Sequence, residues 1–79
     1  MENTDKLPEG SAVIGLRQIA KGVKQGDLKK VVVASNCPEW LIEKIKAAGS
    51  VELFRFSSDE REFGTRLGKT FPVAAAGYR

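Results

Sequence analysis

A short segment that begins with Gly15 combines basic and amide side chains at the start of a predicted helix. Arg17, Gln18 and Lys21 lie in its first turns, away from the apolar stripe. A helix N-terminus presents free N–H groups that favour phosphate. An arginine can donate two hydrogen bonds to a base edge or a phosphate, and a glutamine both donates and accepts, as reading a purine edge requires. The segment therefore fits a nucleic-acid contact; the alternative is an ordinary solvated helix face.

A second segment, residues 63–72, places glycines around basic and aromatic side chains. Lys69, Thr70 and Phe71 follow a helix stop at Gly68, and Phe71 fits neither a helical nor a strand periodicity. An exposed aromatic ring gives an unstacked base a surface to lie on. The alternative is that Phe71 covers the core at the entry to the last strand, and the sequence alone supports both interpretations equally.

The remaining reactive groups point away from catalysis and metal binding. The chain has one cysteine, Cys37, and no histidine, which excludes a disulfide within the chain and disfavours a zinc site. A thiol beside a helix N-terminus can be reactive, but Cys37 lacks a histidine base and a second cysteine. The acidic run at residues 59–62 suits the first turn of a helix, where negative charges interact favourably with the helix dipole. We expect no cofactor.

Length and charge give the setting for these segments. With 79 residues, the chain has room for one domain with a modest core. We predict a flexible N-terminal tail at residues 1–10 and a single RNA-binding domain at residues 11–79. A net charge of +3 permits a polyanionic partner without requiring one. The start is too polar for a signal peptide, no apolar run could cross a bilayer, and a lone thiol suits a reducing cytoplasm, so we expect a cytoplasmic protein without a membrane partner.

Hydrophobic periodicity predicts the elements that must position the two segments. Apolar residues at i, i+3, i+4 and i+7 indicate a helix over 16–25 that stops at Gly26. The continuous apolar run over 30–34 indicates a strand covered on both faces, and Pro38 begins a second helix that ends at Gly49.

The second half of the chain continues the alternation. We expect a strand over 51–56, a third helix with a capping box of Ser57 and Glu60, and a last strand over 73–76. A short edge strand at 12–14 would precede the first helix. The sum is an α/β fold, a three-layer α/β/α sandwich around a small mixed sheet.

The order of the motifs adds a resemblance to a known family. A Gly-x-basic-Gln-x-x-Lys helix start at 15–21 is followed by Val-Val-Val-Ala at 31–34, a turn with Pro38, and Phe-Gly-x-x-Leu-Gly-Lys-x-x-Pro-x-Ala at 63–74. Over residues 12–77 the chain resembles the kink-turn-binding family that includes the ribosomal proteins L-seven-Ae and L-thirty-e. The resemblance implies an α/β/α sandwich without enzymatic activity that binds RNA kink-turns, in which sheared G·A pairs beside a bulge bend the helix sharply.

By position, the resemblance implies two groups of contact residues. One group meets the G·A pairs and nearby phosphates: Gly15, Arg17, Gln18 and Lys21. The other packs against the bulged nucleotides: Lys69, Thr70 and Phe71. Asn36, in the turn after the central strand, lies on the same edge of the family fold and is a further candidate. Many members carry Asn-Glu in place of Arg17-Gln18, which leaves the preferred base pairs open.

We therefore predict an RNA-binding protein that recognises a kink-turn or a similar internal-loop RNA, as a ribosomal or ribonucleoprotein component. The expected partners are structured RNA, ribosomal RNA included, and other ribonucleoprotein subunits. Two alternatives stand beside this prediction. One is a protein–protein module that kept the fold without RNA binding, and the other is a thiol enzyme that depends on Cys37.

Overall fold

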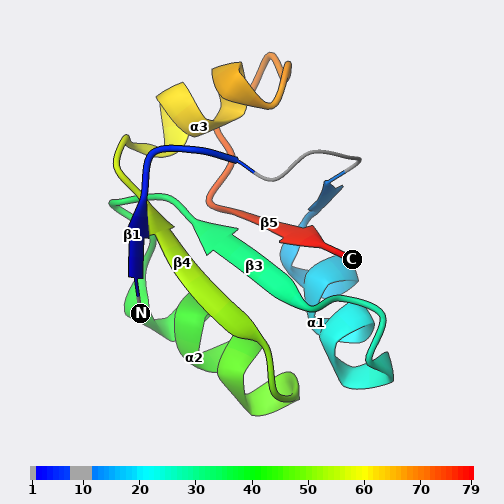
Figure 1. Cartoon of the computed structure of the whole chain (residues 1–79). Coiled ribbons are helices and arrows are strands. Elements are labelled where there is room, and N and C mark those ends of the chain that lie inside the picture. The colour runs from blue at the N-terminus through cyan, green and yellow to red at the C-terminus, as the bar shows by residue number, and fades with distance from the viewer. Residues whose placement is uncertain (1, 8–11) are drawn as a thin grey trace.

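The structure, a computed structural model, describes residues 2–7 and 12–79 and contains a five-stranded mixed sheet with helices on both faces (Figure 1). The strand order is β1-β4-β3-β5-β2. The central strand β3 runs parallel to β4 and antiparallel to β5. Along the chain, the elements are β1 (Glu2–Thr4), β2 (Val13–Ile14), α1 (Leu16–Gln25), β3 (Lys30–Val33), α2 (Glu39–Ala48), β4 (Glu52–Phe56), α3 (Glu60–Arg66) and β5 (Ala75–Tyr78).

The central strand contributes to two apolar cores, because successive side chains of a strand point to opposite faces. Val31 and Val33 pack in a cluster with α1 and α2. Val32 packs on the other face in a cluster that includes Phe63 of α3. Burial on both faces explains the continuous run of valines, and the predicted three-layer α/β/α sandwich is confirmed.

The first strand differs from the flexible tail expected at residues 1–10. Glu2–Thr4 pairs in parallel with the end of β4, where Glu2 lies opposite Phe54 and Thr4 opposite Phe56. This pairing satisfies the outer edge of β4, whose N–H and C=O groups would otherwise lie open. The strand carries no alternating apolar pattern, so periodicity could not indicate it. Residues 1 and 8–11 lie outside the described residues.

The cap of α3 also differs from the expected one. The Asp59 carboxylate accepts a hydrogen bond from the Glu62 N–H at 3.0 Å, and Asp59 is the N-cap. The predicted capping box of Ser57 and Glu60 was therefore wrong, because Asp59 and Glu62 offer the same spacing two residues later.

The last strand begins at Ala75, two residues after the predicted start. The Val73 N–H donates instead to the Glu60 carbonyl at 3.1 Å, so Val73 is bound to α3. Contact with the central strand begins only at the next residue, where the Ala74 carbonyl accepts from the Ala34 N–H at 2.8 Å. No helix within residues 2–7 and 12–79 is long and apolar enough to span a bilayer.

Candidate nucleic-acid interface

The topology brings the predicted contact segments to one end of the sheet. β3 ends at Val33, which lies opposite Ala75 at the start of the antiparallel β5. β2 ends at Ile14, which lies opposite Ala76. The start of α1, the turn after β3 and the loop before β5 therefore emerge at the same edge (Figure 1).

The start of α1 is open to an anion. Gly15 is the N-cap, its φ of 103° favours glycine, and it provides no side-chain hydrogen bond; the first turn contains no acidic residue. Arg17, Gln18 and Lys21 are exposed. The N–H groups at a helix start need partners that the helix itself does not supply, and a phosphate is one that suits them.

The loop before β5, residues 68–73, is hydrogen-bonded to α3 at both of its ends. The Lys69 N–H donates to the Gly64 carbonyl at 2.9 Å, and the Val73 N–H donates to the Glu60 carbonyl at 3.1 Å. Gly68 makes the turn between helix and loop with a φ of 74°, in the left-handed region that favours glycine. The backbone of this loop is thus fixed before any ligand arrives.

Gly64 permits a close approach between α3 and the middle of the loop. A Cβ at this position would overlap the Phe71 carbonyl oxygen and lie 3.4 Å from the Cα of Pro72. The neighbouring Phe63 is fully buried and stacks on Phe56, with 5.1 Å between the ring centroids. In the Phe-Gly pair, the phenylalanine packs α3 against the sheet, and the glycine leaves the space that the loop needs to lie against α3.

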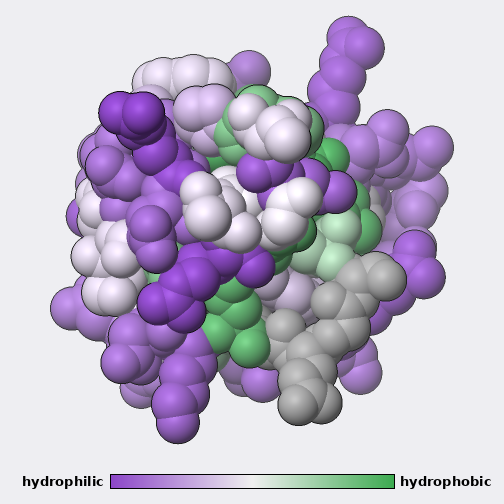
Figure 2. Space-filling view, turned by 90° about the horizontal axis from the view of Figure 1, so that it is seen from above, coloured by the Kyte–Doolittle hydropathy of each residue, from purple (hydrophilic) through white to green (hydrophobic). Residues whose placement is uncertain are grey.

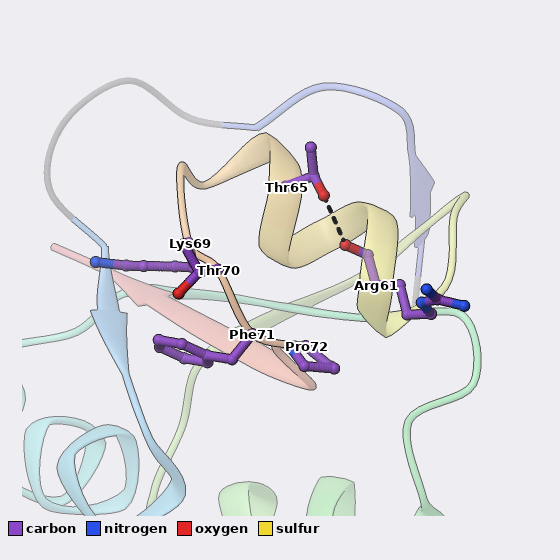
Figure 3. A pocket seen from close by; sticks show the side chains of 6 residues that line it. All are labelled: Arg61, Thr65, Lys69, Thr70, Phe71 and Pro72. Atoms are coloured by element: carbon purple, nitrogen blue, oxygen red, sulfur yellow. Dashed lines mark hydrogen bonds between the residues drawn. The ribbon is translucent and has the colours of Figure 1, made fainter.

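The ring of Phe71 lies outside the core, with 53% of the residue exposed. This exposure decides between the two interpretations of the sequence, and the one in which Phe71 covers the core was wrong. Phe71 and Lys69 point to the same side of the loop, toward β2 and the start of α1 (Figure 3). An open hollow of about 390 Å³ lies beside the loop, lined by Arg61, Thr65, Lys69, Thr70, Phe71 and Pro72.

A smaller hollow of about 210 Å³ lies along α1 and includes two of the predicted contact residues, Gln18 and Lys21. Gln25 and Arg79 also line it. Neither belongs to a sequence motif, and the topology alone brings Arg79 beside α1. The structure therefore extends the polar surface of α1 beyond the residues that the sequence indicates.

Asn36 has a role in holding the fold together. Its side-chain oxygen accepts a hydrogen bond from the Glu60 N–H at 3.0 Å, which satisfies one of the free donors at the start of α3. Asn36 is exposed at the same end of the sheet as the other candidates. Its amide nitrogen donates to no group among the described residues, and its oxygen keeps a second lone pair, so both atoms can meet an RNA group.

Cys37 is buried, and its thiol donates a weak hydrogen bond to the Pro38 carbonyl with 3.7 Å between sulfur and oxygen. Burial raises the pKa of Cys37 from 9.0 to about 11, with a further rise from the charge of Glu60 and an opposing effect from Arg55. The thiol is therefore protonated at neutral pH, whereas a nucleophile needs the thiolate. Among the described residues, no cluster of His, Cys, Asp and Glu could hold a metal ion.

We expect the native protein to react slowly with a chromogenic disulfide reagent at pH 8, and the urea-unfolded protein to react rapidly. The raised pKa also stabilises the native state at any pH below 9.0, and this contribution is lost as the pH rises through about 11. Absorbance of the released thiol measures the two rates. Equal rates in the native and unfolded protein would show that Cys37 is accessible and ionised after all.

The chain is similar in sequence to one protein family and to several ribosomal proteins of archaea. Residues 3–78 match the profile of the Ribosomal protein L7Ae/L30e/S12e/Gadd45 family. A protein of Archaeoglobus fulgidus named large ribosomal subunit protein eL30 is 39% identical over 69 residues, which are 87% of this chain and 79% of that protein. Proteins of the same name from Methanothrix thermoacetophila and Methanosarcina mazei are 35% and 32% identical, covering 84% and 92% of this chain and 63% and 75% of their own lengths.

A solved structure, described as a protein with unknown function from Bacillus halodurans C, shares the fold. It superposes with a TM-score of 0.64 at 18% identity, covering 84% of this chain and 68% of that one. At this identity the likeness concerns the fold alone.

Proposed function

Since the chain belongs to the Ribosomal protein L7Ae/L30e/S12e/Gadd45 family, as its motifs predicted, we propose that it binds RNA as a ribosomal or ribonucleoprotein component and recognises a kink-turn or a similar internal loop. Its partners would be ribosomal RNA or another structured RNA, together with neighbouring ribonucleoprotein subunits in the cytoplasm. Residues 11–79 would form the RNA-binding domain. The relatives named above are large ribosomal subunit proteins, which supports the ribosomal part of this proposal.

The observation that carries the proposal is the exposed ring of Phe71 on a fixed loop, at the same end of the sheet as the open start of α1. Unpaired bases in RNA bulges are bound by stacking on exposed aromatic rings. Helix starts and lysines contact the phosphates on either side. In this arrangement Phe71 receives a bulged base, Lys69 and Thr70 contact its backbone, and the start of α1 faces the adjacent base pairs.

In the same proposal, Arg17 and Gln18 contact the edges of the base pairs beside the bulge, and Gly15 and Lys21 contact phosphates. Asn36 would add a donor at the same edge. The protein would have no enzymatic activity, which agrees with the protonated, buried thiol of Cys37.

The decisive experiment is a titration of the protein with a kink-turn RNA and with a straight duplex of equal length. We expect tighter binding to the kink-turn RNA, because only the bend presents a bulged base to Phe71 and two stems to the start of α1. Affinity for both RNAs should fall as the salt concentration rises, because phosphate contacts release counterions. Equal affinity at moderate salt would contradict kink-turn recognition, and no binding to either RNA would favour a protein–protein module.

Three alanine variants of α1 provide the controls. Arg17→Ala and Gln18→Ala should each cost about 1–3 kcal/mol of binding free energy and reduce discrimination between G·A and Watson–Crick pairs, because both side chains would contact base edges. Lys24 lies further along the helix and could contact only phosphate, so Lys24→Ala should lower the affinity evenly for all RNAs. The same small loss in all three variants would show that α1 does not contact base edges.

A further inference from the structure

The hollow beside the 68–73 loop has a second wall, formed by α3, in which Arg61 lies outside the sequence motifs. Arg61 and Thr65 of α3 line it together with Lys69, Thr70, Phe71 and Pro72. We propose, on the basis of the proposed function, that an RNA strand crosses this hollow from Phe71 onto α3, and that Arg61 binds one of its phosphates. The RNA site would then extend over the loop to the opposite face of the sheet from α1.

Arg61 is free to bind a phosphate because no carboxylate among the described residues pairs with it. The Asp59 carboxylate caps α3, and the Glu62 carboxylate lies 3.3 Å from the Nε of Arg66. Within the described part of the chain, Arg61 takes part in no ion pair, and its side chain is exposed.

The groups in the hollow suit a strand better than a single small anion. Lys69 and Arg61 point in opposite directions (Figure 3), so a cation lies at each end. The same hollow is lined by the hydroxyls of Thr65 on α3 and Thr70 on the loop, and by Phe71. Separate phosphates of one strand can meet the two cations, while a base between them stacks on the ring.

The hydroxyl of Thr65 can serve the RNA backbone as an acceptor. It donates its hydrogen to the Arg61 carbonyl at 3.1 Å, so its oxygen keeps lone pairs for another donor. The 2′-hydroxyl of a ribose is such a donor. The molecular face seen from the α3 side is mainly hydrophilic, with only small hydrophobic areas, as a surface for a nucleic acid backbone should be (Figure 2).

The test compares Arg61→Ala with Arg66→Ala in titrations of a kink-turn RNA. Both variants remove one positive charge from the same helix, but Arg66 lies outside the hollow and is paired with Glu62. We expect Arg61→Ala to weaken binding about 5- to 10-fold and to reduce the slope of log affinity against log salt by about 0.7–0.9, the loss of one phosphate contact. Arg66→Ala should change the affinity less than about twofold, because a paired exposed charge contributes little.

Two further measurements test whether the affinity lost in Arg61→Ala comes from a contact between Arg61 and a phosphate. Arg61→Lys should restore the salt slope, because it restores the charge. Neutral methylphosphonate linkages can be placed one at a time along the bulged strand. At one position the change should weaken binding by the unmodified protein. Arg61→Ala should bind the RNA changed at that position as tightly as it binds the unchanged RNA. Thermal melting should show both alanine variants folded like the unmodified protein.

Equal affinities of the two alanine variants would overturn the α3 contact. The same holds if no linkage distinguishes Arg61→Ala from the unmodified protein. In either case, tight binding of the kink-turn RNA by the unmodified protein would leave the proposed function standing. Absence of that binding would overturn both proposals.

Discussion

Replacing Phe71 by alanine is expected to weaken RNA binding by about 1–3 kcal/mol while the domain stays folded. The residue is 53% exposed, so its truncation removes little apolar packing. The free energy lost is that of a base stacked on the ring, which stacks on no other aromatic ring in the part of the chain that the structure describes. Titration with kink-turn RNA measures the loss, and thermal melting of the same variant shows that the fold is intact.

Phe63→Ala provides the contrast, because Phe63 has the same side chain in the core, fully buried against Phe56. Removing a buried phenylalanine costs roughly 3–5 kcal/mol of folding stability, a large part of the roughly 5–15 kcal/mol available to a native protein. We expect Phe63→Ala to melt far below the unmodified protein. If Phe71→Ala melted as low, with unchanged affinity of its folded fraction, Phe71 would be a structural residue.

Replacing Gly64 by alanine should destabilise the domain and impair RNA binding together. An alanine inside a helix ordinarily stabilises it by roughly 0.5–1 kcal/mol relative to glycine. Here the added Cβ would overlap the Phe71 carbonyl oxygen, a backbone atom that cannot rotate away. The loop must move off α3, which breaks the hydrogen bond from Lys69 to the Gly64 carbonyl or strains it.

The cost of such overpacking is typically about 1–3 kcal/mol, and it would appear as a lower melting temperature. The displaced loop would also carry Phe71 and Lys69 out of place, so the variant should bind kink-turn RNA more weakly even at temperatures where it is fully folded. A variant that melts higher than the unmodified protein and binds RNA equally well would show that the loop does not depend on this close approach.

Much of the fold follows from the sequence because its signals are local. The valines of 31–33 indicate a strand buried on both faces, and glycines correctly mark the end of α1 and the turn after α3. The β1 strand could not be predicted, since its residues are polar and its partner β4 lies far along the chain. The predicted start of the last strand was two residues too early. Alanine and glycine, which make up most of this strand, have low strand propensity, so the sequence does not define where the strand begins.

Some residues of the candidate site could likewise be predicted from the sequence, and others only from the structure. The motifs indicate Arg17, Gln18 and Lys69, and the structure exposes all three at one end of the sheet. The exposure of Phe71 depends on how the loop folds back over Gly64. The hydrophobic pattern of the sequence does not predict this path of the loop. The availability of Arg61 depends on which carboxylates pair with other groups, and only the three-dimensional arrangement gives that. Contact of each of these residues with RNA stays a prediction.

The position of β5 inside the sheet has a consequence for the synthesis of this protein. β5 lies between β3 and β2, and it is the last strand along the chain. As the chain emerges from the ribosome, β2 appears early, but its partner residues Ala76 and Gly77 of β5 leave the exit tunnel much later. The unit of β3, α2 and β4 is local in sequence and can assemble earlier, whereas the strands that flank the proposed RNA site depend on late, long-range pairing. The scaffold of the domain can therefore form while translation is under way, but its binding edge can be completed only after translation has passed β5.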